Sequence, residues 1–135
     1  MDTPESITAG SERVGVNKVY VPQEALRKNE QNILVPKFNL NPAREFGIVT
    51  YLLTPSANPL IEDPSPIIRE LRKNLEHFTD DDFILAIGNP MLIGWAVALA
   101  ADANNGKVSM LQWNGGDRKY KSVSAKLWEV SDEGQ

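Results

Sequence analysis

Residues 81–106 read DDFILAIGNPMLIGWAVALAADANNG, where two acids lead into an apolar strand and a Gly-Asn-Pro break leads into an apolar helix. The segment Phe83 to Ile87 is apolar at every position, which is typical of a central parallel strand covered on both faces. Asn89-Pro90 has the cap-then-proline chemistry of a helix start, and Asn105-Gly106 has the chemistry of a helix end. The stretch therefore predicts one strand-helix unit of an α/β protein.

The same alternation continues on both sides of this stretch. Gly47 to Leu53 is a β-rich run, Ser65-Pro66 opens an amphipathic helix, and residues 107–113 form another strand. A hairpin turn at Asn114 to Asp117 leads into a last strand from Tyr120 to Val130. Strands joined through helices must lie parallel. We therefore expect a small α/β sandwich of two or three layers, with a three-stranded parallel β-α-β-α-β core and an antiparallel C-terminal strand.

The N-terminal part has a different character. Residues 1–15 are polar and unpatterned and predict an arm, residues 16–130 predict a single α/β domain, and residues 131–135 predict a polar tail. Two β-prone runs, VNKVYVPQ and NILVPKFNL, predict a hairpin or a pair of edge strands joined by the charged EALRKNEQ. Pro22 and Pro36 each remove a ladder donor, which places both strands at an edge.

The second helix contains the apolar run Met91 to Ala101 and is apolar on almost every side. Gly94 and Ala98 are small and four residues apart, so we expect them to bring the helix backbone close to the sheet. The outer side of the helix then needs a cover, which is either the N-terminal hairpin or another subunit. The run is also shorter than the roughly 18 residues that a membrane span needs.

Composition limits the classes of function. The chain has 135 residues, a net charge of −4 and no cysteine. One ordinary domain fits this length, and the acidity provides no overall attraction to nucleic acid or to an anionic membrane. A disulfide, a thiolate nucleophile and a cysteine-ligated metal are excluded, and the start MDTPESITAG lacks the layout of a signal peptide. We therefore expect no membrane partner, no secretion through a signal peptide and no cofactor.

The turn at Gly88-Asn89 is a candidate ligand site, because it precedes a helix N-terminus at the carboxyl end of a strand. However, GNPMLIG does not match a dinucleotide or phosphate-loop pattern, and Pro90 removes an amide donor. We interpret the turn as a structural corner. If a ligand binds there, the residues that we expect to hold it are Gly88, Asn89 and Gly94.

Other polar residues provide no reaction. Asp80, Asp81 and Asp82 could hold a cation, but successive side chains of an extended segment point to alternate faces, so we interpret them as a solvated loop. His77 is the only histidine, and no catalytic triad can be assembled around it; we expect it near a helix C-terminus. We therefore predict no catalytic residue, no metal site and no enzyme.

The last strand combines cations with aromatic residues, as surfaces that stack single-stranded bases do. An edge strand guarded by lysines would have the same composition, and we prefer this interpretation, so we do not expect nucleic acid as a partner. The cations are Arg118, Lys119, Lys121 and Lys126. The residues that we predict at protein interfaces are Ile7, Val14, Trp95, Trp113, Tyr120 and Trp128. We expect a partner to order the polar ends, with Ile7 and Val14 as the anchors of the first arm.

Several motifs together resemble a group of short tailed-bacteriophage proteins. They are LNPAREFG, the amphipathic LRKNLEHF, DDDFILAIGNPMLIG, ALAADANNGKV and LQWNGGDRKY, and the resemblance covers residues 20–121. That group has no established catalytic residues to transfer. One departure is Asn89, where aspartate is the more familiar neighbour of the proline, which argues against an acid-dependent role for the turn. The resemblance implies a viral origin and supplies no reaction.

Three functions from different classes remain open. Our first choice is a non-enzymatic bacteriophage protein, an accessory structural subunit that docks on the head, neck or tail through protein–protein contacts. The alternatives are an inhibitor of a host enzyme, such as RNA polymerase or a defence nuclease, and a small nucleotide-binding Rossmann-like protein. The expected partners are other phage structural proteins, a host protein or further copies of the chain. The expected location is the virion or the host cytoplasm.

Overall fold

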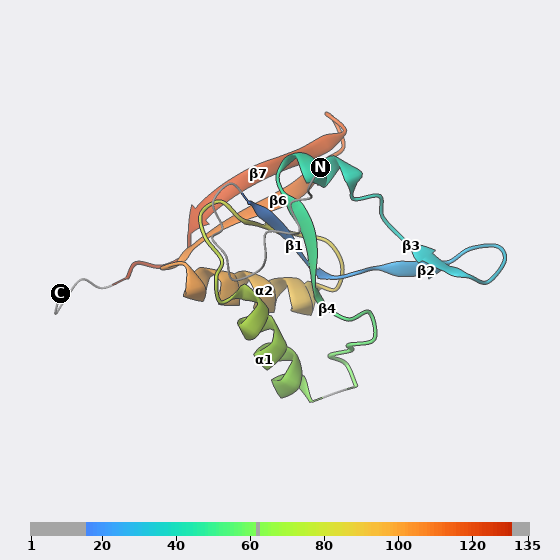
Figure 1. Cartoon of the computed structure of the whole chain (residues 1–135), viewed down its shortest axis with the longest axis horizontal. Helices are drawn as coiled ribbons and strands as arrows, with labels where there is room; N and C mark the ends of the chain where they lie inside the picture. The colour runs from blue at the N-terminus through green and yellow to red at the C-terminus, as the bar shows by residue number, and fades with distance from the viewer. Residues whose placement is uncertain (1–15, 62, 131–135) are drawn as a thin grey trace, which may run out of the picture.

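The computed structural model describes residues 16–61 and 63–130 (Figure 1). Five strands form one sheet in the order β4-β1-β5-β6-β7. The first four run parallel, and the last is antiparallel to its neighbour. The strands are β1 (Lys18–Gln23), β4 (Ile48–Leu53), β5 (Phe83–Leu85), β6 (Lys107–Asn114) and β7 (Lys119–Lys126). The predicted α/β class and the antiparallel C-terminal strand are confirmed, but this strand ends at Lys126 and not at Val130 as predicted. The predicted arm 1–15 and tail 131–135 lie outside the described residues.

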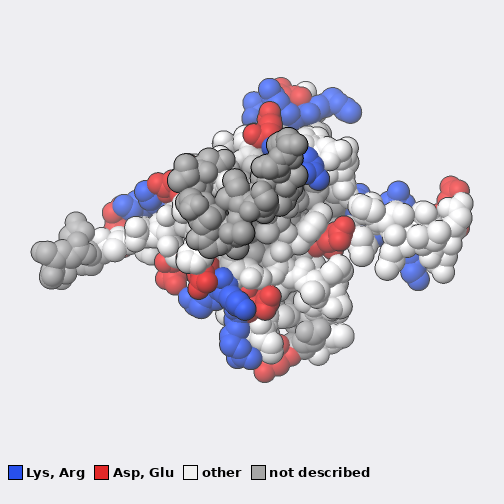
Figure 2. Space-filling model, in the orientation of Figure 1, with Lys and Arg blue, Asp and Glu red and all other residues white. Residues whose placement is uncertain are grey.

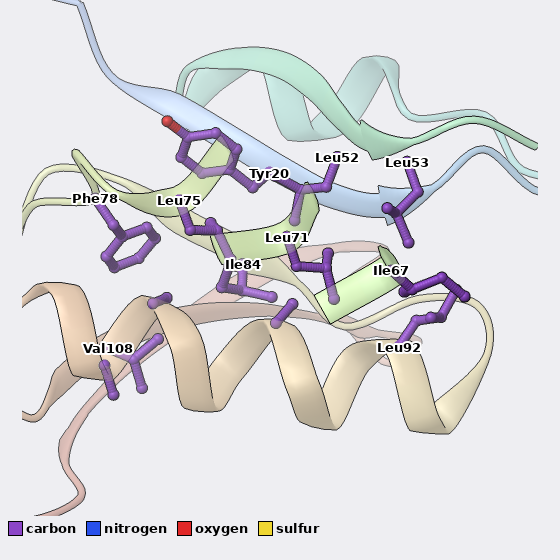
Figure 3. Packing of buried hydrophobic residues seen from close by; sticks show 13 residues of the cluster. Tyr20, Leu52, Leu53, Ile67, Leu71, Leu75, Phe78, Ile84, Leu92 and Val108 are labelled. Carbon is purple, nitrogen blue, oxygen red and sulfur yellow. The ribbon is translucent and has the colours of Figure 1, made fainter. Parts of the chain in front are cut away.

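Two helices, α1 (Pro64–Leu75) and α2 (Pro90–Ala103), pack against one face of the sheet. Asn89 caps α2 as expected, because its side-chain oxygen accepts a hydrogen bond from the Met91 amide at 2.8 Å. The cap of α1 is Asp63 instead of Ser65, since the pair Asp63-Pro64 offers the same chemistry two residues earlier. The side chains between helices and sheet form a continuous apolar layer (Figure 3). Its larger members are Tyr20, Leu52, Leu53, Ile67, Leu71, Leu75, Phe78, Ile84, Leu92 and Val108.

A second, thinner apolar layer covers the other face of the sheet. It forms around a single 3₁₀ turn, η2 (Asn41–Glu45), whose Ala43 is fully buried. Phe46 and Phe83 meet edge to face there, with ring centroids 5.5 Å apart. The buried members of this layer are Val19, Val21, Ala43, Leu85, Leu111 and Tyr120. β5 therefore needs apolar residues on both faces, which explains its unbroken apolar sequence.

β1 is a central strand, so the edge position predicted for it is wrong. It lies between β4 and β5, and it is buried from Val19 to Pro22. Pro22 fits because the ladder with β5 ends at the pair Tyr20 and Ile84, before the proline is reached. A missing amide donor costs little at a point where that neighbouring strand has already ended. The parallel part of the sheet consequently has four strands instead of three.

The hairpin is also formed by other residues than expected. β2 (Leu26–Lys28) pairs antiparallel with β3 (Leu34–Pro36), so the predicted pairing of VNKVYVPQ with NILVPKFNL is wrong. The segment expected to connect the strands contains β2 itself. The Asn29 side chain closes the turn by accepting hydrogen bonds from the amides of Gln31 and Ile33 at 2.9 and 3.0 Å. Pro36 lies at an edge as predicted, because both strands of a two-stranded sheet are edges. Figure 1 shows this hairpin projecting beyond the body of the protein.

The outer surface of α2 holds the small residues that were expected to face the sheet. Gly94 and Ala98 are exposed, and a Cβ added to Gly94 would meet nothing within 4 Å. The predicted close approach is wrong, because Leu92, Ala96, Ala100 and Ala101 form the buried face. α1 packs beside α2, whereas the hairpin extends away from it. Neither helix in the described ranges has the length and apolar character needed to cross a membrane.

Candidate functional site

The carboxyl ends of the parallel strands β1, β4 and β5 lie at the same end of the sheet. From β1 the chain continues to β4 on one side, and from β5 it continues to β6 on the other side. Such a reversal leaves a crevice outside the strand ends, where open α/β sheets bind their ligands. We therefore expect a ligand, if one binds, at the carboxyl end of these strands.

A hollow of about 650 Å³ lies at this carboxyl end of the strands. The start of the hairpin, the loop after β4 and the turn after β5 line it together. Its main lining residues are Gln23, Glu24, Leu34, Lys37, Phe38, Ser56, Gly88 and Asn89. Two of the three predicted ligand residues, Gly88 and Asn89, thus lie side by side in the hollow. The third, Gly94, lies on the exposed side of α2 and does not line it.

Two polar side chains of the hollow, those of Gln23 and Asn89, are engaged in hydrogen bonds within the protein. The Gln23 amide nitrogen donates to the carbonyls of Thr54 and Ala57 at 2.8 and 2.7 Å. The Asn89 oxygen is used by the α2 cap, and Pro90 has no amide hydrogen to offer. The backbone at Gly88 has φ of 107°, which explains the glycine without any ligand. These contacts support the interpretation of the turn as a structural corner.

Exposed apolar side chains occur on two segments, the hairpin region and the loop between β4 and α1. On the hairpin, Ile33 is 57% exposed and Leu34 59%, and just after β3 Phe38 is 40% exposed; we refer to these three as the hairpin surface. On the loop between β4 and α1, Leu60 is 74% exposed and Ile61 79%. A hairpin paired over three residues per strand cannot bury its own side chains. Apolar residues grouped on a projecting element are typical of a protein interaction site.

None of these five residues was predicted as a site residue. A usable signal was present for Leu60-Ile61, an apolar pair inside an otherwise polar, proline-rich loop, whereas Ile33 and Leu34 belong to the run NILVPKFNL that was predicted as a strand. An apolar pair without a helical or alternating pattern has no element of its own that would bury it.

The predicted aromatic interface residues do not form one surface. Trp95 is partly buried against the helix-side layer, and Tyr120 is buried in the opposite layer, where desolvation raises the pKa of its hydroxyl. Trp113 is 45% exposed and meets the Tyr120 ring edge to face, with centroids 5.0 Å apart. Trp128 is 42% exposed but follows the far end of β7, away from Trp113. The predicted anchors Ile7 and Val14 lie outside the described residues.

The cations of β7 are partly neutralised. β7 forms an edge of the sheet, as expected. Lys121 pairs with Asp117 at 2.9 Å, and Lys126 pairs with Glu129 at 3.1 Å. In the view of Figure 2, basic side chains occur in small groups beside acidic ones and form no continuous stripe. Paired lysines of this kind offer little to a phosphate backbone.

The three consecutive aspartates differ in their surroundings: Asp81 is exposed, whereas the carboxylates of Asp80 and Asp82 each make structural hydrogen bonds. Asp82 is fully buried and accepts hydrogen bonds from the Lys18 amide at 3.0 Å and the Thr79 amide at 2.8 Å. The interpretation as a solvated loop is therefore wrong for Asp82. Asp80 accepts hydrogen bonds from Asn104 and Lys107, which lower the pKa of its carboxyl. Over residues 16–61 and 63–130, no three side chains that could ligate a metal lie together.

His77 is exposed just after the end of α1, as expected. Its ring Nε2 lies 3.5 Å from the Glu76 carboxylate. This surface contact provides no catalytic arrangement.

A protein-family model described as Phage Pam3 gp32-like protein matches residues 17–127. The matched range includes the whole five-stranded sheet, both helices and the hairpin. The resemblance to a group of tailed-phage proteins is confirmed by this match. No curated protein and no solved structure matches the chain.

Proposed function

The chain belongs to the Phage Pam3 gp32-like protein family, and we propose that it is a non-enzymatic accessory subunit that docks on a larger phage assembly through protein–protein contacts. The hairpin surface is the observation that carries this proposal. Two of its large apolar side chains, Ile33 and Leu34, lie on the hairpin that projects from the body of the protein, and the third, Phe38, lies just after it. Such an element can enter a groove of a partner without any change in the rest of the fold.

The energetic argument rests on burial. Complete burial of an Ile, Leu or Phe side chain contributes roughly 1.5–3 kcal/mol. The hairpin surface is already partly covered, so each of its residues would contribute less than that on docking. Leu60 and Ile61 add a second, more exposed apolar group on the neighbouring loop. The hairpin surface is the apolar centre of the proposed interface, and Leu60 and Ile61 offer a second apolar contact.

Charged residues flank the hairpin surface. Arg27 and Lys28 are exposed on β2, and the Lys37 ammonium lies 5.5 Å from the centre of the Phe38 ring. An apolar centre with a charged rim is the usual composition of a protein interface. The hollow at the root of the hairpin supports a non-catalytic role, because the side chains of Gln23 and Asn89 are engaged in structural hydrogen bonds.

Particle incorporation tests the proposal. A phage that lacks the gene is complemented with the natural chain, with an Ile33→Asp/Leu34→Asp variant, or with Val123→Asp as the matched control. Val123 is 63% exposed on β7, so an acid there should not disturb the fold. We expect the natural chain and the control in purified particles at the same fixed stoichiometry, and the hairpin variant at a strongly reduced level.

Two results would contradict this function. One is equal incorporation of the hairpin variant and the control. The other is absence of the natural chain from purified particles. If the chain were absent from particles but retained a host enzyme through the hairpin surface, the inhibitor function would replace the structural one.

A further inference from the structure

The two edges of the main sheet differ in protection. β7 forms one edge and carries Lys119, Lys121 and Lys126, whereas β4 forms the other edge and reads IVTYLL. Proteins protect exposed edges with lysines, prolines, bulges or very short strands, because an open edge is a template for another strand. β4 has none of these: it spans six residues and contains neither a charge nor a proline.

The backbone of β4 has polar groups directed to the open side. The Ile48 amide donates to the Asn17 carbonyl at 2.9 Å, so Ile48 directs its backbone polar groups toward β1. Because these directions alternate along a strand, Val49, Tyr51 and Leu53 direct theirs away from β1. In the part of the chain that the structure describes, β1 is the only strand that pairs with β4. Ile48 and Tyr51 are also each 42% exposed at this edge.

We propose that β4 pairs with β4 of a second copy of the chain, antiparallel across a two-fold axis near Tyr51, and joins two sheets into one. A two-fold axis makes the pairing of a strand with itself antiparallel. Val49 then lies opposite Leu53 of the second copy, and Tyr51 lies opposite its own equivalent. No like charges meet along the strands, because β4 is uncharged.

Charged residues beside β4 are complementary in this arrangement. Arg44 precedes the strand, and Glu24 follows Gln23, which pairs with Leu53 at the other end of β4. Both residues line a hollow of about 570 Å³, which is also lined by Val49 and Tyr51 of β4 and by the segment from Pro36 to Asn41. Antiparallel pairing places the beginning of one β4 beside the end of the other. Arg44 of each copy consequently approaches Glu24 of the second copy.

Tyr51 lies between the two charges. The pKa of its hydroxyl is raised by burial and by the Glu24 carboxylate, and the Arg44 guanidinium acts in the opposite direction. Glu24 and Arg44 of the same copy therefore both lie near the side chain that would be closest to the two-fold axis.

Sedimentation velocity on the full chain tests the edge pairing. We expect a reversible dimer with a dissociation constant below about 100 μM. Tyr51→Lys would place two ammonium groups opposite each other and weaken the dimer at least tenfold. Val123→Lys, a matched lysine on the opposite edge of the sheet, should leave the dimer unchanged. A natural chain that stays monomeric at this concentration, or a Tyr51→Lys dimer as stable as the parent, would overturn the proposal.

A charge exchange provides a second test that does not alter the strand. Arg44→Glu and Glu24→Arg should each weaken the dimer several-fold, and the double variant should restore it. Failure of the double variant to restore a weakened dimer would contradict the two-fold arrangement. The Ile33→Asp/Leu34→Asp variant should keep the dimer, because the hairpin surface takes no part in this contact. Loss of docking and loss of dimerisation are thereby distinguishable.

Discussion

The buried carboxylate of Asp82 accepts a hydrogen bond from the backbone amide of Lys18, 64 residues earlier in the chain, at 3.0 Å. The contact joins the beginning of β1 to the residue that precedes β5. The second oxygen of the carboxylate accepts from the amide and the hydroxyl of Thr79 at 2.8 and 3.1 Å. A single acid therefore fixes the loop after α1 and aligns two neighbouring central strands.

Replacement of Asp82 should destabilise the protein strongly. Hydrogen bonds to a charged group contribute about 1.5–3 kcal/mol each, and a buried donor left without its acceptor carries a further cost. We expect Asp82→Ala to lower the free energy of unfolding by roughly 2–4 kcal/mol in urea denaturation. The control is Asp81→Ala, an exposed neighbour, which should change it by less than about 0.5 kcal/mol. Equal stability of the two variants would contradict the structural role of Asp82.

Leu85 tests the central position of β5. Its side chain is fully buried in the apolar layer that contains Ala43 of η2. Leu85→Ala should therefore leave a cavity and lower the free energy of unfolding by roughly 2–5 kcal/mol. Leu127→Ala serves as the comparison, because Leu127 is 47% exposed beyond the end of β7. Thermal unfolding of the Leu85 variant at the temperature of the parent would show that β5 is not a core strand.

Gly106 and Gly94 should respond in opposite directions to the same substitution. Gly106 has φ of 86°, and a Cβ there would collide with the Trp128 carbonyl, so Gly106→Ala should destabilise by about 1–3 kcal/mol. Gly94 lies in the exposed part of α2 with free space around it, so Gly94→Ala should stabilise by roughly 0.5–1 kcal/mol. Differential scanning calorimetry of both variants checks the sign of each change.

The turn at Gly88-Asn89 should not bind nucleotides tightly. Calorimetric titration with mono-, di- and cyclic dinucleotides should give no dissociation constant below about 1 mM. This value corresponds to a binding free energy of about −4 kcal/mol. The informative variant is Asn89→Ser, because serine keeps the helix cap and removes the amide. A micromolar response in the natural chain that Asn89→Ser abolishes would refute this expectation and favour the nucleotide-binding function.

Acid should weaken one surface contact before the core is affected. The hydrogen bonds from Asn104 and Lys107 lower the pKa of Asp80 in the folded protein. A lowered pKa stabilises the fold above the unfolded value, near pH 4, and that contribution is lost as the pH falls through the folded value. Asp80→Asn should therefore flatten the stability profile below about pH 4 and leave its shape at pH 7 unchanged. The effect should be small, because the pair is exposed to solvent.

Features that depend on neighbouring residues could be predicted from the sequence alone. Asn89 and Pro90 begin α2, and Gly106 follows its end, where its amide bonds to the Ala101 carbonyl at 2.7 Å. The alternation of strands and helices from Gly47 onward determined the α/β class, because parallel strands require crossovers. The lysines of β7 indicated an edge strand, and the sheet order agrees. In each case the deciding contacts lie within a few residues, so local chemistry is sufficient.

Features that depend on distant contacts were decided by the tertiary structure. Pro22 indicated an edge by local chemistry, but β1 is central and tolerates the proline because its ladder with β5 ends before Pro22. Asp82 was predicted to be solvated, but in the folded chain it is buried and accepts a hydrogen bond from the Lys18 amide. The exposure of Ile33 and Leu34 depends on a hairpin too short to bury them. The sequence determines which segments can form strands and helices, whereas strand order and burial follow from packing among segments far apart in the chain, which no local pattern records.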